Sequence, residues 1–239
     1  MRKIFLLFTL ALLTVSAQAQ FEHPDLKSGK RHVSSMLLMP LQVEITKVSM
    51  KGPEPMIEQS REVETSLAPV IGEVIHNLGC TVDDTSVTVK TMKEDPDLKY
   101  AVDDLQKQFD STTSEMVRKS KDVRKGRFSL GDNVAKLPQG EKVDALVFVR
   151  ASGQVLTGGK KAFGMLIGGA AFDMVQILIG VVDAKNGDVL YFSKPVMLKN
   201  LAKDPADTKK GMEKSFKNFM KANGTSVAEK KEEKPQPGN

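Results

Sequence analysis

Two long apolar runs constrain the fold of this chain more than any other feature of its sequence. Residues 143–149 are apolar apart from Asp144, and residues 172–183 have a similar character, with many Val and Ile. Strands that are covered on both faces have this composition, because neither of their faces meets water. The second run leads through Asn186-Gly187 into a third extended segment, 188–193. Because Asn and Gly tolerate positive φ angles, the sequence predicts a β-hairpin here.

Helical periodicity predicts three main helices. The first carries an apolar stripe from Val63 to Leu78 and should end at Gly79, which is suited to the left-handed position after a helix. Pro69 removes one backbone hydrogen bond within this stretch. We therefore expect either a kink at Pro69 or a regular helix that starts only around Ser66.

The second helix should start at Asp95, an N-cap residue, followed by Pro96 at the first helical position. Its apolar positions recur at alternating spacings of four and three as a narrow seam that extends to Val123. Such a seam suits a partner helix or the chain's own sheet, and we favour the sheet. The third helix, from Asp207, carries the core residues Met212, Phe216, Phe219 and Met220 on one face.

Shorter patterns complete the expected fold. Residues 41–46 alternate between apolar and polar side chains, and residues 81–82 and 87–89 are short strand candidates. The sequence thus predicts a single α/β domain over residues 34–222, with a mixed sheet of about five strands and three main helices. A lead-in segment, 20–33, should precede it, and a disordered charged tail, 223–239, should follow.

The first nineteen residues have the pattern of a secretory signal peptide. Arg2 and Lys3 are followed by an apolar stretch to Val15, and Ala17-Gln18-Ala19 fits the small-x-small cleavage pattern. The apolar stretch is too short to span a bilayer as a helix. Gln20 stands where a bacterial lipoprotein has its lipid-bearing cysteine. We therefore expect a periplasmic or secreted protein without a lipid anchor, and leave outer-membrane association open.

The segment 162–182 allows two interpretations. It is almost entirely apolar and contains Gly164 and Gly168 at the spacing that lets two membrane helices approach closely. Dense glycine and the Val/Ile-rich second half instead favour a small-residue loop or short helix over 160–171, followed by a buried strand. If that loop is exposed, it is a candidate interaction surface, formed by Gly164, Met165, Leu166, Ile167 and Gly168.

A second candidate surface is the basic end of the 95–123 helix. Its cations suit the helix dipole and water, and contact with an anionic membrane or polymer surface is the alternative interpretation. The basic residues proposed for such contact are Arg118, Lys121, Arg124 and Lys125.

Composition and motifs exclude several classes of function. The formal net charge is +5, from 35 basic and 30 acidic residues, which is too mild and too evenly spread for a nucleic-acid-binding protein. The single cysteine, Cys80, cannot form an internal disulfide, and we expect it to be a small buried residue. Gly158-Gly159-Lys160 lacks the remaining residues of a phosphate-binding loop. We therefore predict no catalytic, cofactor or metal site.

The order of elements, with Met36-Leu37-Leu38-Met39-Pro40 at its start and the run 182–189 late in the chain, resembles a group of bacterial envelope proteins. The group comprises the curli-secretion (CsgG-type) lipoproteins, the lipoprotein activators of penicillin-binding proteins and the TolB amino-terminal domain. The resemblance covers residues 34–222 and implies a non-enzymatic binding or assembly module of the envelope. Its partner would be a protein or another envelope component. An enzyme with dispersed site residues, and a self-associating structural subunit, remain the alternatives.

Overall fold

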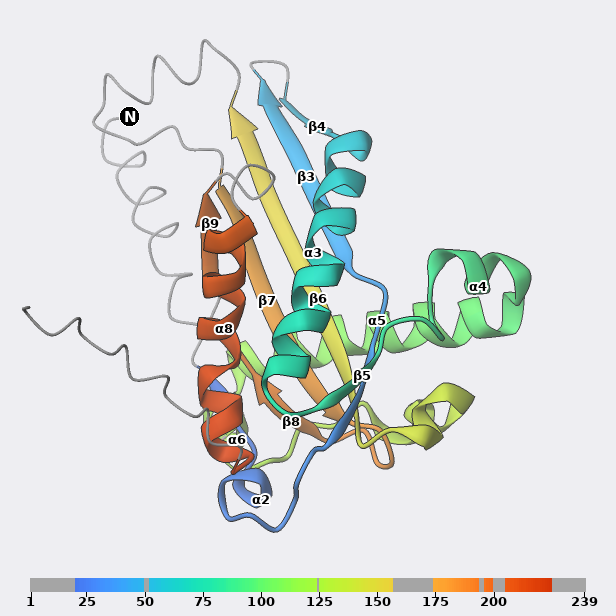
Figure 1. Ribbon diagram of the computed structural model, residues 1–239, viewed down its shortest axis with the longest axis vertical. Coiled ribbons are helices and arrows are strands. Elements are labelled where there is room, and N and C mark those ends of the chain that lie inside the picture. The colour runs from blue at the N-terminus through green and yellow to red at the C-terminus, as the bar shows by residue number, and fades with distance from the viewer. Residues whose placement is uncertain are drawn as a thin grey trace, which may run out of the picture.

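The two apolar runs form the two longest strands of a mixed β-sheet in a computed structural model (Figure 1). The structure describes residues 20–49, 52–123, 125–156, 174–193, 196–199 and 205–224. Strand β6 (Ala145–Leu156) pairs antiparallel with β7 (Met174–Asp183) along the whole length of β7. The predicted hairpin is confirmed, because β7 continues through a turn into β8 (Val189–Phe192) and Gly187 has a φ of 74°.

Within the described ranges the sheet has nine strands, so the prediction of about five was wrong. Its order is β1 (Phe21–Glu22), β8, β7, β6, β2 (Ser35–Leu38) and β5 (Thr81–Asp83). Strand β3 (Gln42–Ser49) follows β2 in the chain and pairs parallel with the later part of β6. It also pairs antiparallel with β4 (Gly52–Pro55). Strand β9 (Val196–Lys199) pairs with β7. Most of the strands that the prediction missed are two to four residues long, too short to show a period.

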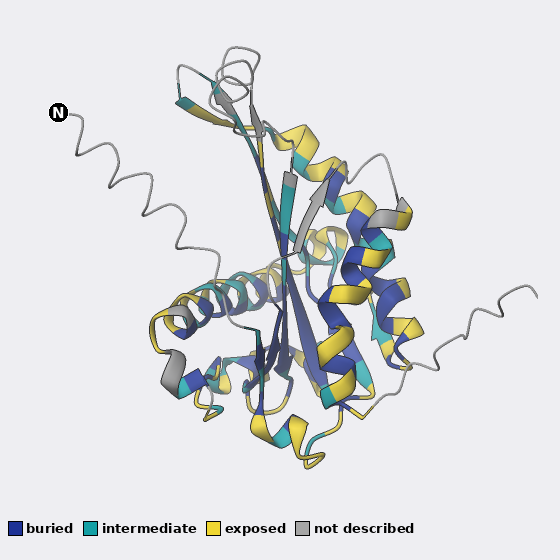
Figure 2. Cartoon of the chain, turned by 90° about the vertical axis from the view of Figure 1, so that its left-hand side faces the viewer, coloured by how far each residue is buried: buried dark blue, intermediate teal, exposed yellow. Residues whose placement is uncertain are grey.

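Helices cover the two faces of this sheet unequally (Figure 2). On one face lie α3 (Ile57–Asn77) and α8 (Pro205–Ala222), with a core that includes Ile71, Phe216 and Phe219. On the other lies α5 (Pro96–Arg118), followed by α6 (Ser120–Val123). The smaller helices are α2 (Pro24–Lys27), α4 (Val89–Glu94), η2 (Gly131–Lys136) and η3 (Pro138–Lys142).

The predicted helices are confirmed, with changes at their ends. Asp95 caps α5 by accepting hydrogen bonds from the backbone N–H groups of Asp97 and Leu98. The seam of α5 is buried against strand residues of this chain's own sheet, so the partner-helix interpretation is wrong for its described side chains. Helix α3 begins at Ile57 and continues through Pro69, which excludes a regular start near Ser66. Gly79 follows α3 with a φ of 79°.

Three local predictions need correction. Residues 87–89 do not form a strand, because Thr88 and Thr91 form a capping box that starts α4. The 20–33 segment is not a lead-in outside the domain: Phe21 is buried in the core and β1 extends the sheet. Asn223 is also part of the domain, because its side-chain amide exchanges two hydrogen bonds with the backbone of Val33. Gly224 follows with a φ of 72°, and residues 225–239 of the predicted tail lie outside the described part of the chain.

The described residues also bear on the membrane interpretation of 162–182. Residues 174–182 belong to strand β7, with Ile177, Ile179 and Val181 fully buried, which confirms the predicted buried strand and excludes a helix across this stretch. Among the described helices, none has the length and apolar character needed to cross a bilayer. The predicted signal, 1–19, lies outside the described residues.

Candidate functional site

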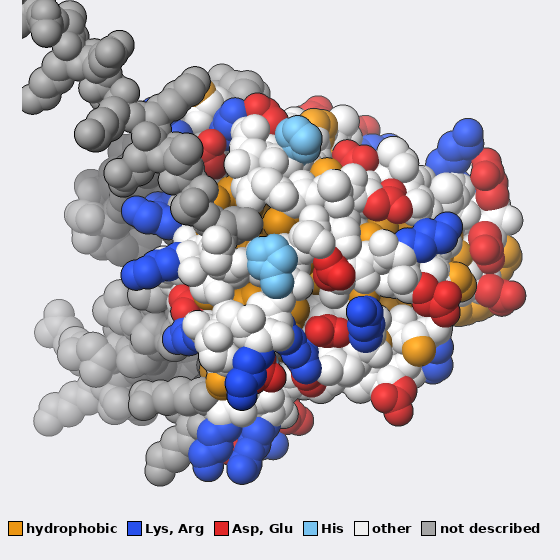
Figure 3. Space-filling model, turned by 60° about the horizontal axis from the view of Figure 1, so that its bottom comes forward, with side chains coloured by type: hydrophobic (Ala, Val, Ile, Leu, Met, Phe, Trp, Pro, Cys, Tyr) orange, Lys and Arg blue, Asp and Glu red, His pale blue; other side chains and the backbone are white. Residues whose placement is uncertain are grey.

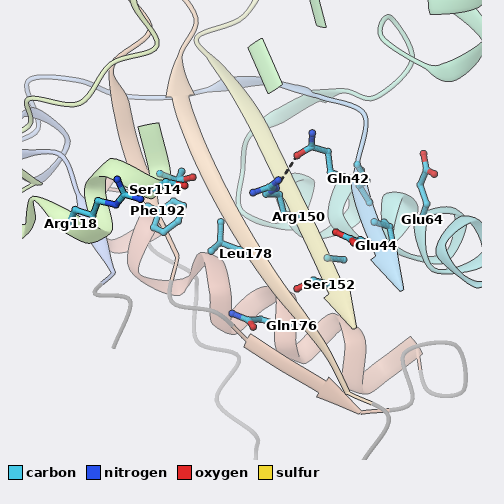
Figure 4. A pocket seen from close by; sticks show the side chains of 14 residues that line it. Gln42, Glu44, Glu64, Ser114, Arg118, Arg150, Ser152, Gln176, Leu178 and Phe192 are labelled. Atoms are coloured by element: carbon cyan, nitrogen blue, oxygen red, sulfur yellow. Dashed lines mark hydrogen bonds between the residues drawn. The ribbon is translucent and has the colours of Figure 1, made fainter. Parts of the chain in front are cut away.

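On the face of the sheet that carries α5, the described elements cover only part of the length of the strands. On this face of β6, Phe148 is buried beneath α5, whereas the next outward-facing residues, Arg150, Ser152 and Gln154, are exposed. The uncovered part forms the floor of an open cavity of about 830 Å³ (Figure 4). We call this the polar sheet cavity; residues that line it are Leu41, Gln42, Val43, Glu44, Glu64, Thr113, Ser114, Arg118, Arg150, Ala151, Ser152, Gln176, Leu178 and Phe192.

Arg150 joins three elements at the edge of this cavity. Its Nε donates to Oε1 of Gln42 on β3 at 3.0 Å (Figure 4). Its guanidinium also donates to Oδ2 of Asp110 on α5 at 2.8 Å. Burial raises the pKa of Asp110, and the positive charge of Arg150 offsets only part of this rise. Arg150 therefore holds α5 over the sheet at Asp110, within the second half of the helix.

The opposite wall of the cavity is acidic. Glu44 on β3 is exposed, and Glu64 reaches the cavity from α3. Burial raises the pKa of Glu64, and nearby Arg61 lowers it in part. The cavity thus has Arg118 of α5 at one side and Glu64 of α3 at the other, with Arg150 of β6 lying beside Glu44 of β3 (Figure 4).

The hydroxyl groups on the α5 wall already have partners. Thr113 Oγ1 and Ser114 Oγ both donate to the backbone carbonyl of Asp110, at 3.1 and 2.8 Å. A nucleophilic hydroxyl instead needs a base within hydrogen-bond reach. Within the described ranges, no group of three His, Cys, Asp or Glu residues is placed to hold a metal ion. The arrangement is suited to hydrogen bonding and charge contacts along a polar partner.

Of the predicted interaction residues whose side chains are described, Arg118 and Lys125, the structure places only Arg118 in this cavity. Arg118 is exposed and lines it, while Lys125 is exposed in the turn after α6 and does not. Lys121 lies in α6, but its side chain, like Arg124, is outside the description. The predicted loop surface of Gly164, Met165, Leu166, Ile167 and Gly168 also lies outside the described residues.

At the end of the molecule that carries α2 and α6, Figure 3 shows Lys and Arg side chains gathered at one edge.

The cavity's other polar residues were missed by sequence reasoning, although a signal exists for some of them. After the apolar run 143–149, polar residues occupy every second position at Arg150, Ser152 and Gln154. This change from continuous to alternating apolar character indicates that one face of the strand becomes exposed to solvent. The contributions of Glu64 and Arg118 depend on tertiary packing and have no comparable local signal.

Cys80 has the structural role that the sequence predicts. It is buried and its Sγ donates to the carbonyl oxygen of Val33 at 3.5 Å. Burial, together with the charge of Asp144, raises the pKa of the thiol. A raised pKa keeps the group in the unreactive thiol form at neutral pH.

Comparison with known proteins identifies no relative by sequence. No family model and no curated protein matches the chain. Among solved structures, two PelC dodecamers from Paraburkholderia phytofirmans match with TM-scores of 0.35 and 0.36, each at 7% sequence identity. The alignments cover 83% and 84% of this chain, and 94% and 95% of the PelC chains. Likeness at this level does not establish a shared fold.

Proposed function

We propose that this chain is an exported, non-catalytic module that binds another component of the cell envelope through the polar sheet cavity. The observation that carries the proposal is the uncovered part of the sheet, where Arg150, Ser152 and Gln154 face solvent on the side that α5 covers elsewhere. The signal-like leader, residues 1–19, supports export to the periplasm or beyond. The resemblance to envelope binding and assembly modules points to the same kind of function.

The lining of the cavity favours a polar partner over a small apolar ligand. Amide, hydroxyl and charged groups of β3 and β6 line the cavity, and β7 adds the amide of Gln176. Such groups lose hydrogen bonds to water unless a partner replaces them. Opposite charges at the two sides, Arg118 and Glu44, would orient a partner that carries complementary charges. A protein surface or a polar segment of another envelope component meets these requirements.

Site-specific photo-crosslinking tests the proposal. A photoreactive amino acid at Ser152, which is exposed on the floor of the cavity, should give a defined light-dependent adduct in the native envelope. The same residue at Ala135, exposed on η2, is the matched control and should give none. Titrating the purified partner should then show that Ser152→Arg weakens binding about tenfold or more, because the long side chain fills the cavity.

Two results would contradict the proposal. One is an adduct that forms equally at Ser152 and Ala135. The other is a partner whose affinity is the same for the wild-type chain and for Ser152→Arg, with both proteins giving the same thermal midpoint. Either result would show that binding does not use this part of the sheet.

A further inference from the structure

A row of four lysines runs along the solvent-facing side of α8. Lys210, Lys214, Lys217 and Lys221 are separated by four, three and four residues, and all four are exposed. This spacing places them on one narrow side of a helix. At 1.5 Å per residue the row is about 16 Å long. We call it the lysine row.

Packing of α8 fixes the direction in which the lysine row faces. The opposite side of the helix carries Met212, Phe216 and Phe219, which are fully buried against the sheet. Hydrogen bonding adds a further constraint, since the Tyr191 hydroxyl donates to the backbone carbonyl of Ser215. Because α8 cannot rotate without exposing this core, the lysine row is held on the outer surface of the domain (Figure 1).

The charge of the lysine row is not neutralised by the described residues around it. None of its four lysines forms an ion pair with a described residue, whereas the adjacent Lys209 binds Glu73 of α3 at 2.5 Å. Among the α8 residues whose side chains are described, Glu213 is the one exposed acid beside the row. The row therefore presents a positive potential to any surface that approaches this side of the molecule.

We infer that the lysine row binds the surface of an anionic lipid bilayer. Lysine ammonium groups are compact, hydrated point charges, so they suit a surface of many phosphates better than one fixed carboxylate. Because the apolar side of α8 is buried, the contact is electrostatic and the helix does not insert between the lipids. A single-stranded nucleic acid would also need aromatic platforms, and the one exposed Phe, Tyr or Trp in the described part of the chain, Tyr100, is on α5.

Vesicle flotation of the chain without the signal-like leader, residues 20–239, tests this inference. Vesicles of about 30% phosphatidylglycerol in phosphatidylcholine should bind the protein in about 50 mM salt and release it in about 500 mM salt, because salt screens the attraction. Each lysine close to an anionic surface strengthens binding about fivefold. Replacing all four lysines of the row by Gln should therefore weaken binding about a hundredfold or more.

A second quadruple variant provides the control for net charge. Lys90, Lys93, Lys107 and Lys142 are exposed on other elements, and none pairs with a described acid. Replacing these four by Gln removes the same charge and should leave vesicle binding within about threefold of wild type. Circular dichroism melting of both variants checks that the domain is folded.

Three outcomes would overturn the inference: no binding to phosphatidylglycerol vesicles, equal losses in the two quadruple variants, or binding to duplex DNA or heparin but not to vesicles. The last outcome would assign the row to an anionic polymer. Because the lysine row and Ser152 lie on opposite faces of the sheet, failure of vesicle binding leaves the crosslinking result at Ser152 unchanged. The two proposals can therefore fail separately.

Discussion

Replacing Phe109 by Ala should destabilise the domain by about 3–5 kcal/mol, a large part of the stability of a domain of this size. Phe109 is fully buried between α5 and the sheet. Its ring stacks on the ring of Phe148, with ring centroids 4.5 Å apart and planes 8° from parallel. The ring centroid of Phe192 lies 6.3 Å from that of Phe109. Truncation would leave a cavity bounded by two aromatic rings. Urea denaturation followed by circular dichroism measures the loss.

Gly180 provides the complementary test of this contact. A Cβ added at Gly180 of β7 would overlap the Cε2 and Cζ atoms of Phe109. Because the buried ring can move aside only by straining the packed core, Gly180→Ala should destabilise the domain by about 1–3 kcal/mol. In the double variant, the new methyl group occupies part of the space left by Phe109→Ala. The double variant should therefore lose less stability than the sum of the losses of the two single variants.

A control on the same helix separates packing from helix propensity. Tyr100 is 71% exposed on α5, and Tyr100→Ala should change the free energy of unfolding by no more than about 0.5 kcal/mol. Additive losses for Phe109→Ala and Gly180→Ala would show that the two residues do not touch. If Gly180→Ala is as stable as wild type, the Phe109 ring does not lie against Gly180.

The parts of the fold that could be predicted from the sequence are those with a local physical signal. Asn186-Gly187, the Asp95 cap and the seam of α5 each follow from backbone or side-chain chemistry within a few residues, and the structure confirms all three. The short strands carry no such signal. Strand β1 exists because it pairs with β8, about 170 residues along the chain, and its two residues alone do not specify a strand.

The candidate site could be predicted less well, for a related reason. A cavity above a sheet depends on where the covering helix crosses the strands, and α5 crosses β6 so that Phe148 is covered while Arg150 and Ser152 remain exposed (Figure 1). Sequence reasoning selected Arg118 for its charge and not for its neighbours. The sequence predicts which side of α8 faces the core, but only the fold shows that the lysines of the row are exposed while α3 packs beside the helix.

A single carboxylate, that of Asp144, links the starts of two central strands. Its Oδ2 accepts hydrogen bonds from the backbone N–H groups and the hydroxyls of Ser34 and Ser35, at 2.7–3.0 Å. The backbone N–H of Asp144 donates in turn to the carbonyl of Ser35. Burial raises the pKa of Asp144, but the four hydrogen bonds lower it more, to about 2. The ionised carboxylate therefore stabilises the pairing of β2 with β6.

Replacing Asp144 by Asn should lower the free energy of unfolding at pH 7 by about 2 kcal/mol, after allowance for the partial exposure of the carboxylate. Because the folded-state pKa lies below that of the unfolded chain, this stabilisation is complete above about pH 4 and is lost as the pH falls towards 2. The urea midpoints of wild type and Asp144→Asn should therefore converge in acid. Asp132→Asn, at an exposed carboxylate on η2, should differ from wild type by at most about 0.5 kcal/mol. A gap between wild type and Asp144→Asn that stays constant from pH 7 to pH 2.5 or so would contradict a role for the ionised carboxylate.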